Sequence, residues 1–266
     1  MKKVLTIAGS DSSGGAGIQA DIKTVTAYGM YAMSVITALT AQNTTGVYGI
    51  HETPPDFVAL QIDCVFKDIF PDAVKIGMLS NPKTIDAVAV KLQEYAAKNI
   101  VLDPVMISTS GSRLLSADGE KALYKLFALS SLITPNIPEA QALCGVVIKD
   151  KADMERAAKL LSAQAHRPVL LKGGHLTDGE AADCLCDNGS LQWFFSPRID
   201  NPNTHGTGCT LSSAIACGLA GGNTLSQSIQ AAKLYLTEAL ESRLNIGQGK
   251  GPVNHMYNIP NKIIPK

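Results

Sequence analysis

The sequence has few charged residues, no excess of charge of either sign and no long apolar run. Charged residues make up 17% of the 266 positions, and 23 Lys and Arg balance 23 Asp and Glu. A balanced chain has no global field for nucleic acid or an anionic membrane, so any anion must be bound by a local site. The apolar run after Lys3 ends at Asp11, which is too short for a signal peptide or a membrane span. We expect a soluble, cytoplasmic protein.

Cysteine pairs at metal-binding or redox spacing are also missing. In a chain of this size without an export signal, most cysteines are expected to be buried small hydrophobes. One of them, Cys209, differs because it follows Gly-Thr-Gly at a point where a loop should become a helix. The six cysteines are Cys64, Cys144, Cys184, Cys186, Cys209 and Cys217.

Apolar segments alternate with helical patterns almost throughout the chain. This alternation predicts an α/β fold, with a mostly parallel sheet and helices on both faces. Asn188-Gly189 lies between two alternating runs and predicts a hairpin. No linker or repeat divides the chain, so we expect one domain over 1–266. The predicted strands cover 2–9, 31–42, 73–79, 99–105, 130–136 and 167–174, and predicted helices include 16–28, 55–68, 207–220 and 224–243.

Polar residues recur where the predicted strands end, which is where ligands bind in open parallel sheets. The turn "GSDSSGGAG" after the first strand lacks the lysine of a Walker-type loop and does not fit G-x-G-x-x-G. It is either an ordinary strand-to-helix turn or part of a site. Asp21, in the helix that follows, is either a carboxylate aimed at a ligand or a solvated helix residue.

The segment "HGTGCT" (205–210) is more informative. Gly206, Thr207 and Gly208 allow successive backbone N–H groups to converge on a phosphate, and the helix dipole adds positive charge there. In this position Cys209 is expected to be favoured as a thiolate that accepts a proton from an alcohol. The alternative is an ordinary helix start with an inert core cysteine.

Three further strand ends carry oxygen or ammonium groups. Asn136 and Glu139 in "TPNIPEA" provide a hard oxygen pair suited to Mg²⁺, or a capping box, or both. Asp103 ends "VLD" before a proline, and Lys172 precedes two glycines as a candidate phosphate ligand, although a lone lysine is usually a surface group. The polar stretch near 106–114 is typical of a lid over a site.

These segments together resemble a known family. "LTIAGSDSSGGAGIQADIKT", "VITALTAQNT", "KIGML", "LDPVM", "LITPNIPEA", "LKGGH" and "NTHGTGCTLSSAIA" look like those of the hydroxymethylpyrimidine and hydroxymethylpyrimidine phosphate kinases of thiamine biosynthesis. These enzymes belong to the ribokinase-like superfamily. The resemblance runs in the same order from about residue 4 to 255 and closes with "GKGPVNH".

The resemblance implies that Mg·ATP phosphorylates 4-amino-5-hydroxymethyl-2-methylpyrimidine and then its monophosphate. It also implies a homodimer, with no nucleic-acid or membrane partner. The implied catalytic residues are Cys209, which takes the alcohol's proton, and Gly206, Thr207 and Gly208, which hold the transferring phosphoryl group. The implied pyrimidine pocket consists of Gly9, Asp21, Gln42, Met78 and Val105. The implied ligands of ATP and its phosphates are Lys172, Asp103 and Asn136, and those of the metal are Asn136 and Glu139.

Three other functions remain open at this stage. A pyridoxal kinase of the same branch would act on a similar flat ring with a hydroxymethyl group, as its main or a secondary activity. A cysteine hydrolase or acyltransferase would use Cys209 as nucleophile with His175 or His205 as base. A ligand-binding relative without catalysis is the third. The Gly-Thr-Gly-Cys and Asn-x-x-Glu signals argue against the third, and the pyrimidine kinase ranks ahead of all three.

Overall fold

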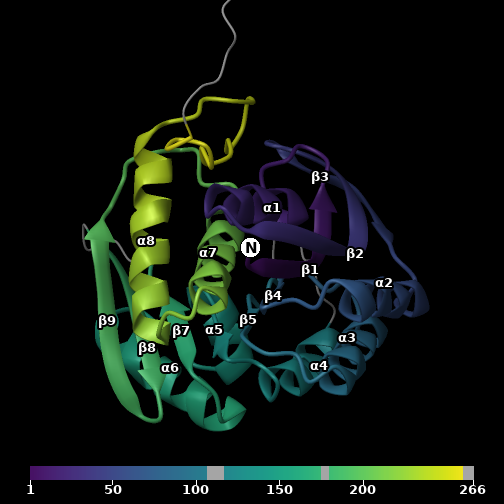
Figure 1. Ribbon diagram of the computed structural model, residues 1–266. Helices are drawn as coiled ribbons and strands as arrows, with labels where there is room; N and C mark the ends of the chain where they lie inside the picture. Colours follow the sequence, from purple (N-terminus) through teal and green to yellow (C-terminus); the bar gives the residue numbers. More distant parts are fainter. Residues whose placement is uncertain (107–116, 175–179, 260–266) are drawn as a thin grey trace, which may run out of the picture.

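A single mixed sheet organises the chain in the computed structural model, which describes residues 1–106, 117–174 and 180–259 (Figure 1). Within these residues the sheet has nine strands in the order β3-β2-β1-β4-β5-β6-β7-β8-β9. The strands are β1 (Lys3–Asp11), β2 (Tyr31–Asn43), β3 (Gly46–Glu52), β4 (Ala73–Ile76), β5 (Ile100–Leu102), β6 (Leu132–Ile133), β7 (Val169–Lys172), β8 (Glu180–Asp187) and β9 (Ser190–Pro197).

The six strands predicted from apolar runs are all confirmed, and β2, β1, β4, β5, β6 and β7 pair in parallel. Their observed bounds are mostly shorter than the predicted ones, because the chain leaves the sheet before its polar ends. The predicted hairpin is β8–β9, whose turn places Asn188 and Gly189 at positive φ. This is the geometry that Asn-Gly favours in a two-residue hairpin turn.

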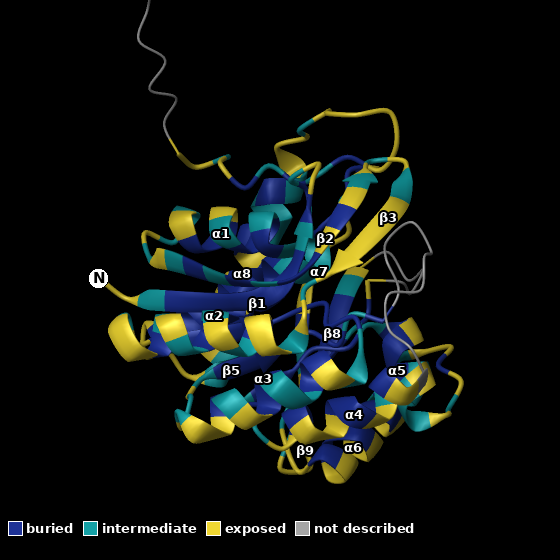
Figure 2. Cartoon of the chain, turned by 90° about the vertical axis from the view of Figure 1, so that its right-hand side faces the viewer, coloured by how far each residue is buried: buried dark blue, intermediate teal, exposed yellow. Residues whose placement is uncertain are grey.

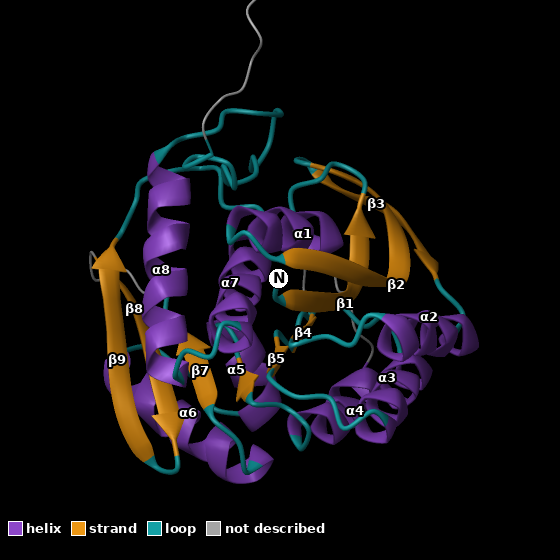
Figure 3. Ribbon diagram, in the orientation of Figure 1, coloured by secondary structure: helices purple, strands orange, loops and turns teal. Residues whose placement is uncertain are grey.

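Helices cover both faces of the sheet (Figure 3). One face packs against α2 to α6 around a core that includes Leu5, Ile76 and Ile133. The other packs against α1, α7 and α8 around Val4 and Ala73. The helices are α1 (Gly17–Ala27), α2 (Pro55–Asp68), α3 (Pro82–Glu94), α4 (Ala117–Phe127), α5 (Ile137–Cys144), α6 (Lys151–Ala165), α7 (Thr207–Ala220) and α8 (Leu225–Glu241).

One strand, β3, was not predicted. It pairs antiparallel with β2 at the edge of the sheet, and its residues are mostly exposed (Figure 2). The sequence "GVYGIHE" contains two glycines and buries no face, so it lacks the apolar alternation by which a strand is detected. A helix spanning a membrane is absent from the described residues, where no helix is both long and apolar enough.

The topology positions the site. The carboxyl ends of the six parallel strands meet at one edge of the sheet, and α7 begins beside them. Helix α7 packs against α1 and against the sheet, and Ile215, Ala216 and Cys217 within it are fully buried. Because α7 is buried on nearly every side, its first turn is held firmly against the strand ends.

Candidate active site

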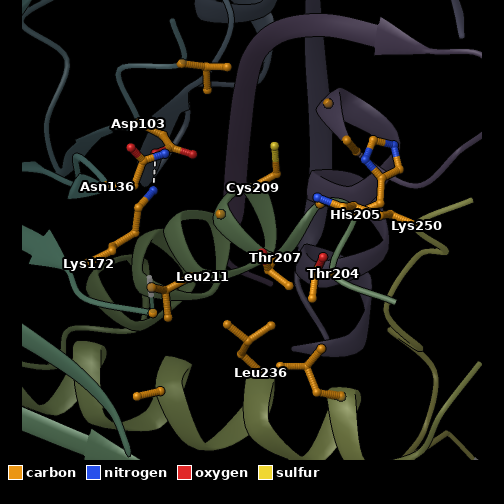
Figure 4. Close-up of a pocket in the computed structure, with 18 of the residues that line it drawn as sticks. Asp103, Asn136, Lys172, Thr204, His205, Thr207, Cys209, Leu211, Leu236 and Lys250 are labelled. Atoms are coloured by element: carbon orange, nitrogen blue, oxygen red, sulfur yellow. Dashed lines mark hydrogen bonds and ion pairs between the residues drawn. The ribbon is translucent and has the colours of Figure 1, made fainter. Parts of the chain in front are cut away.

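A cavity of about 1060 Å³ lies along the carboxyl ends of the parallel strands (Figure 4). Every site residue predicted from the sequence lines it except Asp21. Those lining residues are Gly9, Gln42, Met78, Asp103, Val105, Asn136, Glu139, Lys172, Gly206, Thr207, Gly208 and Cys209. Residues from seven separate segments of the sequence therefore line one cavity.

The start of α7 forms the floor of the cavity. Gly206 precedes the helix with φ of 80°, and a Cβ there would overlap the Gly15 carbonyl oxygen, so glycine is required twice over. The helix begins at Thr207, so its first N–H groups have no carbonyl partner within the helix. Cys209 is the third residue of this turn, as predicted. This is the backbone geometry on which the expectation of a phosphate cradle rests.

The expected thiolate at Cys209 is not what the structure shows. Part of the Cys209 side chain faces the cavity, and the rest is enclosed by protein. This burial disfavours the charged thiolate and raises the pKa of the thiol to about 11. The Lys75 ammonium and an N–H from Gly17 act in the opposite direction, and Asp21 and Asp103 oppose them. Desolvation outweighs the Lys75 ammonium and the Gly17 N–H, so Cys209 is a neutral thiol near pH 7.

Lys172 and Asp103 form an ion pair between neighbouring strand ends. Lys172 Nζ lies 2.6 Å from Asp103 Oδ1, and the Thr134 hydroxyl donates to the same oxygen at 3.2 Å. Burial alone would lower the pKa of Lys172, but the nearby carboxylates of Asp103 and Glu139 raise it. Lys172 is therefore a half-buried ammonium paired with Asp103, and not the surface lysine that was the alternative.

Asn136 and Glu139 form the predicted capping box at α5. The Asn136 side chain accepts from the Glu139 N–H at 2.9 Å, and Glu139 Oε2 accepts from the Asn136 N–H at 2.8 Å. Glu139 is 4% exposed, and burial raises its pKa to about 7, with Lys172 lowering it and Asp103 raising it. Because both residues line the cavity, the capping role does not preclude a metal role.

Asp21, which was expected in the substrate pocket, does not line the cavity. Asp21 is fully buried beneath the cavity, where Lys75 Nζ contacts its carboxylate at 2.8 Å. Thr6 and Ser213 also donate to it, at 2.6 and 2.7 Å. Lys75 lines the cavity in its place, although its side chain is 0% exposed. Asp21 acts on the site through Lys75.

Gln42 lies at the other end of the cavity, at the end of β2. Its amide nitrogen is 3.3 Å from His205 Nε2, and the same ring nitrogen is 2.8 Å from Asp11 Oδ2. His205 is 6% exposed and Asp11 3% exposed. This arrangement makes His205 a structural partner of Asp11, so the hydrolase hypothesis loses that base. Its other candidate, His175, and most of the lid near 106–114 lie outside the described residues.

Besides Lys75, two other charged residues that line the cavity, Lys233 and Asp183, were not predicted from the sequence. Lys233 of α8 and Asp183 of β8 are both buried and form an ion pair of 2.7 Å, and Asp183 also accepts from the Gly173 N–H at 2.9 Å. Lys75 and Lys233 share one signal, which is a lysine inside an apolar segment ("AVKIGML" and "IQAAKLYL"). A lysine in such a place requires a buried carboxylate partner.

The sequence matches a family of known kinases over nearly its whole length. Residues 11–254 match the family model of phosphomethylpyrimidine kinase. The thiamine biosynthesis bifunctional protein ThiED of Geobacter sulfurreducens is 54% identical over 95% of this chain, which spans only 52% of that relative's length. A hydroxymethylpyrimidine/phosphomethylpyrimidine kinase of Rhizobium meliloti is 49% identical over 95% of this chain and 96% of its own.

A solved structure matches the fold. The ADP complex of Bacillus subtilis pyridoxal kinase superposes with a TM-score of 0.90 at 37% identity, covering 97% of this chain and 98% of that one. The predicted ribokinase-like α/β fold is confirmed by this match and by the observed sheet.

Proposed function

The chain belongs to the phosphomethylpyrimidine kinase family and is a kinase of thiamine biosynthesis, and we propose how its cavity performs the two transfers. ATP phosphorylates the hydroxymethyl group of 4-amino-5-hydroxymethyl-2-methylpyrimidine, and the resulting monophosphate is then the second acceptor. One observation supports this best. The cradle at Gly206, the thiol of Cys209 and the Lys172–Asp103 pair line the same cavity as Gln42.

The transferring phosphoryl group is held by the start of α7. The backbone N–H groups of the first turn and the Lys172 ammonium stabilise the negative charge that spreads over its oxygens. Asp103 fixes Lys172, and Thr134 fixes Asp103. Since phosphoryl transfer depends mainly on positioning and charge neutralisation, these contacts provide most of the catalysis.

Cys209 takes the proton of the attacking hydroxyl group. As a thiol of pKa about 11 it is a stronger base, once ionised, than an ordinary cysteine, but only a small fraction is ionised near pH 7. Lys75 lies close enough to lower that pKa, so the buried Lys75–Asp21 pair tunes the base. The lining residues Gly9, Met78 and Val105 form the apolar walls against which the pyrimidine ring packs.

The donor set fits Mg²⁺ bound with a nucleotide. No cluster of three or more His, Cys, Asp or Glu suited to a metal occurs in the described ranges, so a metal held by protein alone is not favoured. Mg²⁺ is commonly held by one or two carboxylates together with waters and phosphates. The Glu139 carboxylate and the Asn136 amide oxygen would hold it here. When bound, Mg²⁺ neutralises charge on the phosphates.

Replacing Glu139 with glutamine should raise the Mg²⁺ concentration required for half-maximal activity by about tenfold, because one anionic ligand is lost. Glutamine preserves the capping box, so the thermal midpoint should change little. A Mg²⁺ titration of initial rates at saturating ATP measures this. An unchanged titration curve would leave Glu139 with the helix-capping role alone.

Replacing Gln42 with alanine should raise the KM for hydroxymethylpyrimidine by at least about tenfold, while the KM for ATP changes less than twofold. The Gln42 amide has both the donor and the acceptor that pair with an aminopyrimidine edge. Steady-state rates with each substrate varied in turn measure the two constants. Equal effects on both would contradict the assignment of Gln42 to the pyrimidine pocket.

The function itself is tested with three acceptors. ATP consumption is measured with hydroxymethylpyrimidine, its monophosphate and pyridoxal, and the products are identified by mass. We expect turnover of both pyrimidines, since formation of the diphosphate is not needed by a pyridoxal kinase. Phosphorylation of pyridoxal alone would contradict the proposal and favour vitamin B6 salvage on the same fold.

We further propose that the chain acts as one kinase domain with a lid near 106–114, in the cytoplasm and as a homodimer. The exposed side chains of Tyr48 and Ile50, which share one face of the edge strand β3, support self-association at that edge.

A further inference from the structure

A buried carboxylate and histidine lie beside the pyrimidine end of the cavity. Asp11 Oδ1 accepts from the backbone N–H and the hydroxyl of Ser13, at 2.9 and 2.7 Å. Asp11 Oδ2 accepts from the N–H groups of Gly15 and Ala16, at 3.1 and 2.8 Å. The same Oδ2 atom is 2.8 Å from His205 Nε2. Within the glycine-rich turn, the Asp11 carboxylate thus accepts four hydrogen bonds, from Ser13, Gly15 and Ala16.

Asp11 is therefore ionised and can only accept. Burial alone would raise its pKa, but the His205 and Ser13 hydrogen bonds lower it to about 2. A lone pair on His205 Nε2 would face this carboxylate at 2.8 Å and be repelled. His205 Nε2 consequently carries a hydrogen and donates it to Asp11.

This assignment restricts the amide of Gln42. A protonated His205 Nε2 is a donor only, so an amide N–H placed 3.3 Å from it finds no acceptor. At the other end, Gln42 Oε1 is 3.1 Å from the hydroxyl of Thr40, whose single hydrogen also has the Ser10 carbonyl oxygen at 2.9 Å. With the amide in this direction, the Gln42 N–H faces the His205 N–H, and the single hydrogen of the Thr40 hydroxyl is shared between the Ser10 carbonyl oxygen and Gln42 Oε1.

Turning the amide through 180° removes the contact between two donors. The Gln42 oxygen then shares the single His205 Nε2 hydrogen with Asp11, the Gln42 nitrogen donates to the Thr40 hydroxyl, and the Thr40 hydrogen is left to the Ser10 carbonyl oxygen alone. The oxygen and nitrogen of an amide are nearly equal in size, so the turn changes no packing. One N–H and one lone pair of Gln42 remain for the cavity that it lines.

We propose that the Asp11–His205 pair locks the direction of the Gln42 amide and thereby makes the site select an aminopyrimidine over an oxopyrimidine. The inference rests on the proposed function and deepens it. An aminopyrimidine offers a ring-nitrogen acceptor beside an amino donor, whereas its 4-oxo analogue offers a ring N–H beside a carbonyl oxygen. A free amide turns over to pair with either edge. A locked amide pairs with only one.

His205 is therefore a positioning residue that acts through Gln42. His205→Met removes the donor to both Asp11 and Gln42 at similar volume, and His205→Gln is the matched control because its amide nitrogen has two hydrogens to donate. The readout is the ratio of kcat/KM for hydroxymethylpyrimidine to that for its 4-oxo analogue. We expect at least about 100-fold in the unmodified protein and the His205→Gln variant, and less than about tenfold in His205→Met.

Each outcome decides the inference. An undiminished ratio in His205→Met overturns it, and so does an equal loss for both pyrimidines with a raised KM for ATP, which indicates that His205 only holds the start of α7. Should His205→Met fail to fold, Thr40→Val removes the partner at the other end of the amide and should also lower the ratio. An unchanged ratio there overturns the inference too. If the unmodified protein phosphorylates neither pyrimidine, the proposed function fails first.

Discussion

Replacing Cys209 with alanine should lower kcat for hydroxymethylpyrimidine by about 100-fold or more, with little change in the KM for ATP. A positioned general base contributes roughly 10²- to 10⁴-fold, and alanine has no group to accept the hydroxyl proton. The cradle at Gly206 and the Lys172–Asp103 pair stay in place, so ATP binding is retained. Steady-state kinetics at saturating Mg²⁺ measure both constants, and near-normal turnover would remove Cys209 as the base.

The same prediction has a pH signature. Only the ionised thiol accepts a proton, and its pKa is raised to about 11, so the ionised fraction grows about tenfold with each pH unit below that value. The kcat/KM of the unmodified protein should therefore rise from pH 7 to 10, whereas that of Cys209→Ala should not rise. Cys209→Ser, with a far less acidic hydroxyl, is the matched control and should behave like alanine. A flat profile for the unmodified protein would contradict a role for the thiolate.

Replacing Lys75 with methionine should lower the free energy of unfolding by about 3–5 kcal/mol. The substitution leaves the Asp21 carboxylate charged and unpaired at a site that is 0% exposed, which is the costly way to break a buried ion pair. Among the described residues, the Thr6 and Ser213 hydroxyls remain as its side-chain donors. Urea unfolding followed by circular dichroism measures the change.

Two further variants show how much of the stability lost in Lys75→Met comes from the unpaired charge and how much from lost packing. Lys125→Met breaks an exposed ion pair with Asp86 and should cost less than about 1 kcal/mol. Lys75→Met combined with Asp21→Asn removes both charges but keeps an oxygen acceptor, so it should recover part of the stability. If the double variant is no more stable than Lys75→Met alone, the cost lies in lost packing and not in an unpaired charge.

The sequence predicted the fold, and it predicted residues that line one cavity, for a physical reason. Parallel strands must end at one edge, so polar residues that follow successive apolar runs converge even when far apart in the chain. That reasoning placed Asp103, Asn136 and Lys172 in one cavity. It failed for Asp21 because which face of a helix meets the sheet depends on packing, and Lys75, 54 residues away, occupies the nearer position.

The ionisation state of Cys209 could not be predicted from the sequence for a related reason. A helix terminus is visible in the pattern and favours a thiolate, but burial is not visible. The glycine-rich turn folds over Cys209, and the N–H of Gly17 reaches its sulfur. Desolvation then exceeds the effect of the helix. Local motifs predict which groups meet, whereas the pKa depends on everything else that packs around them.

The close contact of Gly15 with Gly206 has a consequence for biosynthesis. A ribosome delivers residue 15 long before residue 206, and the contacts of Asp11 with His205 and of Asp21 with Ser213 span similar distances along the chain. A nascent chain released before α7 emerges contains all six parallel strands but has no floor to its cavity. We therefore expect catalytic competence to arise late in folding, and we expect premature termination to yield protein that binds neither substrate productively.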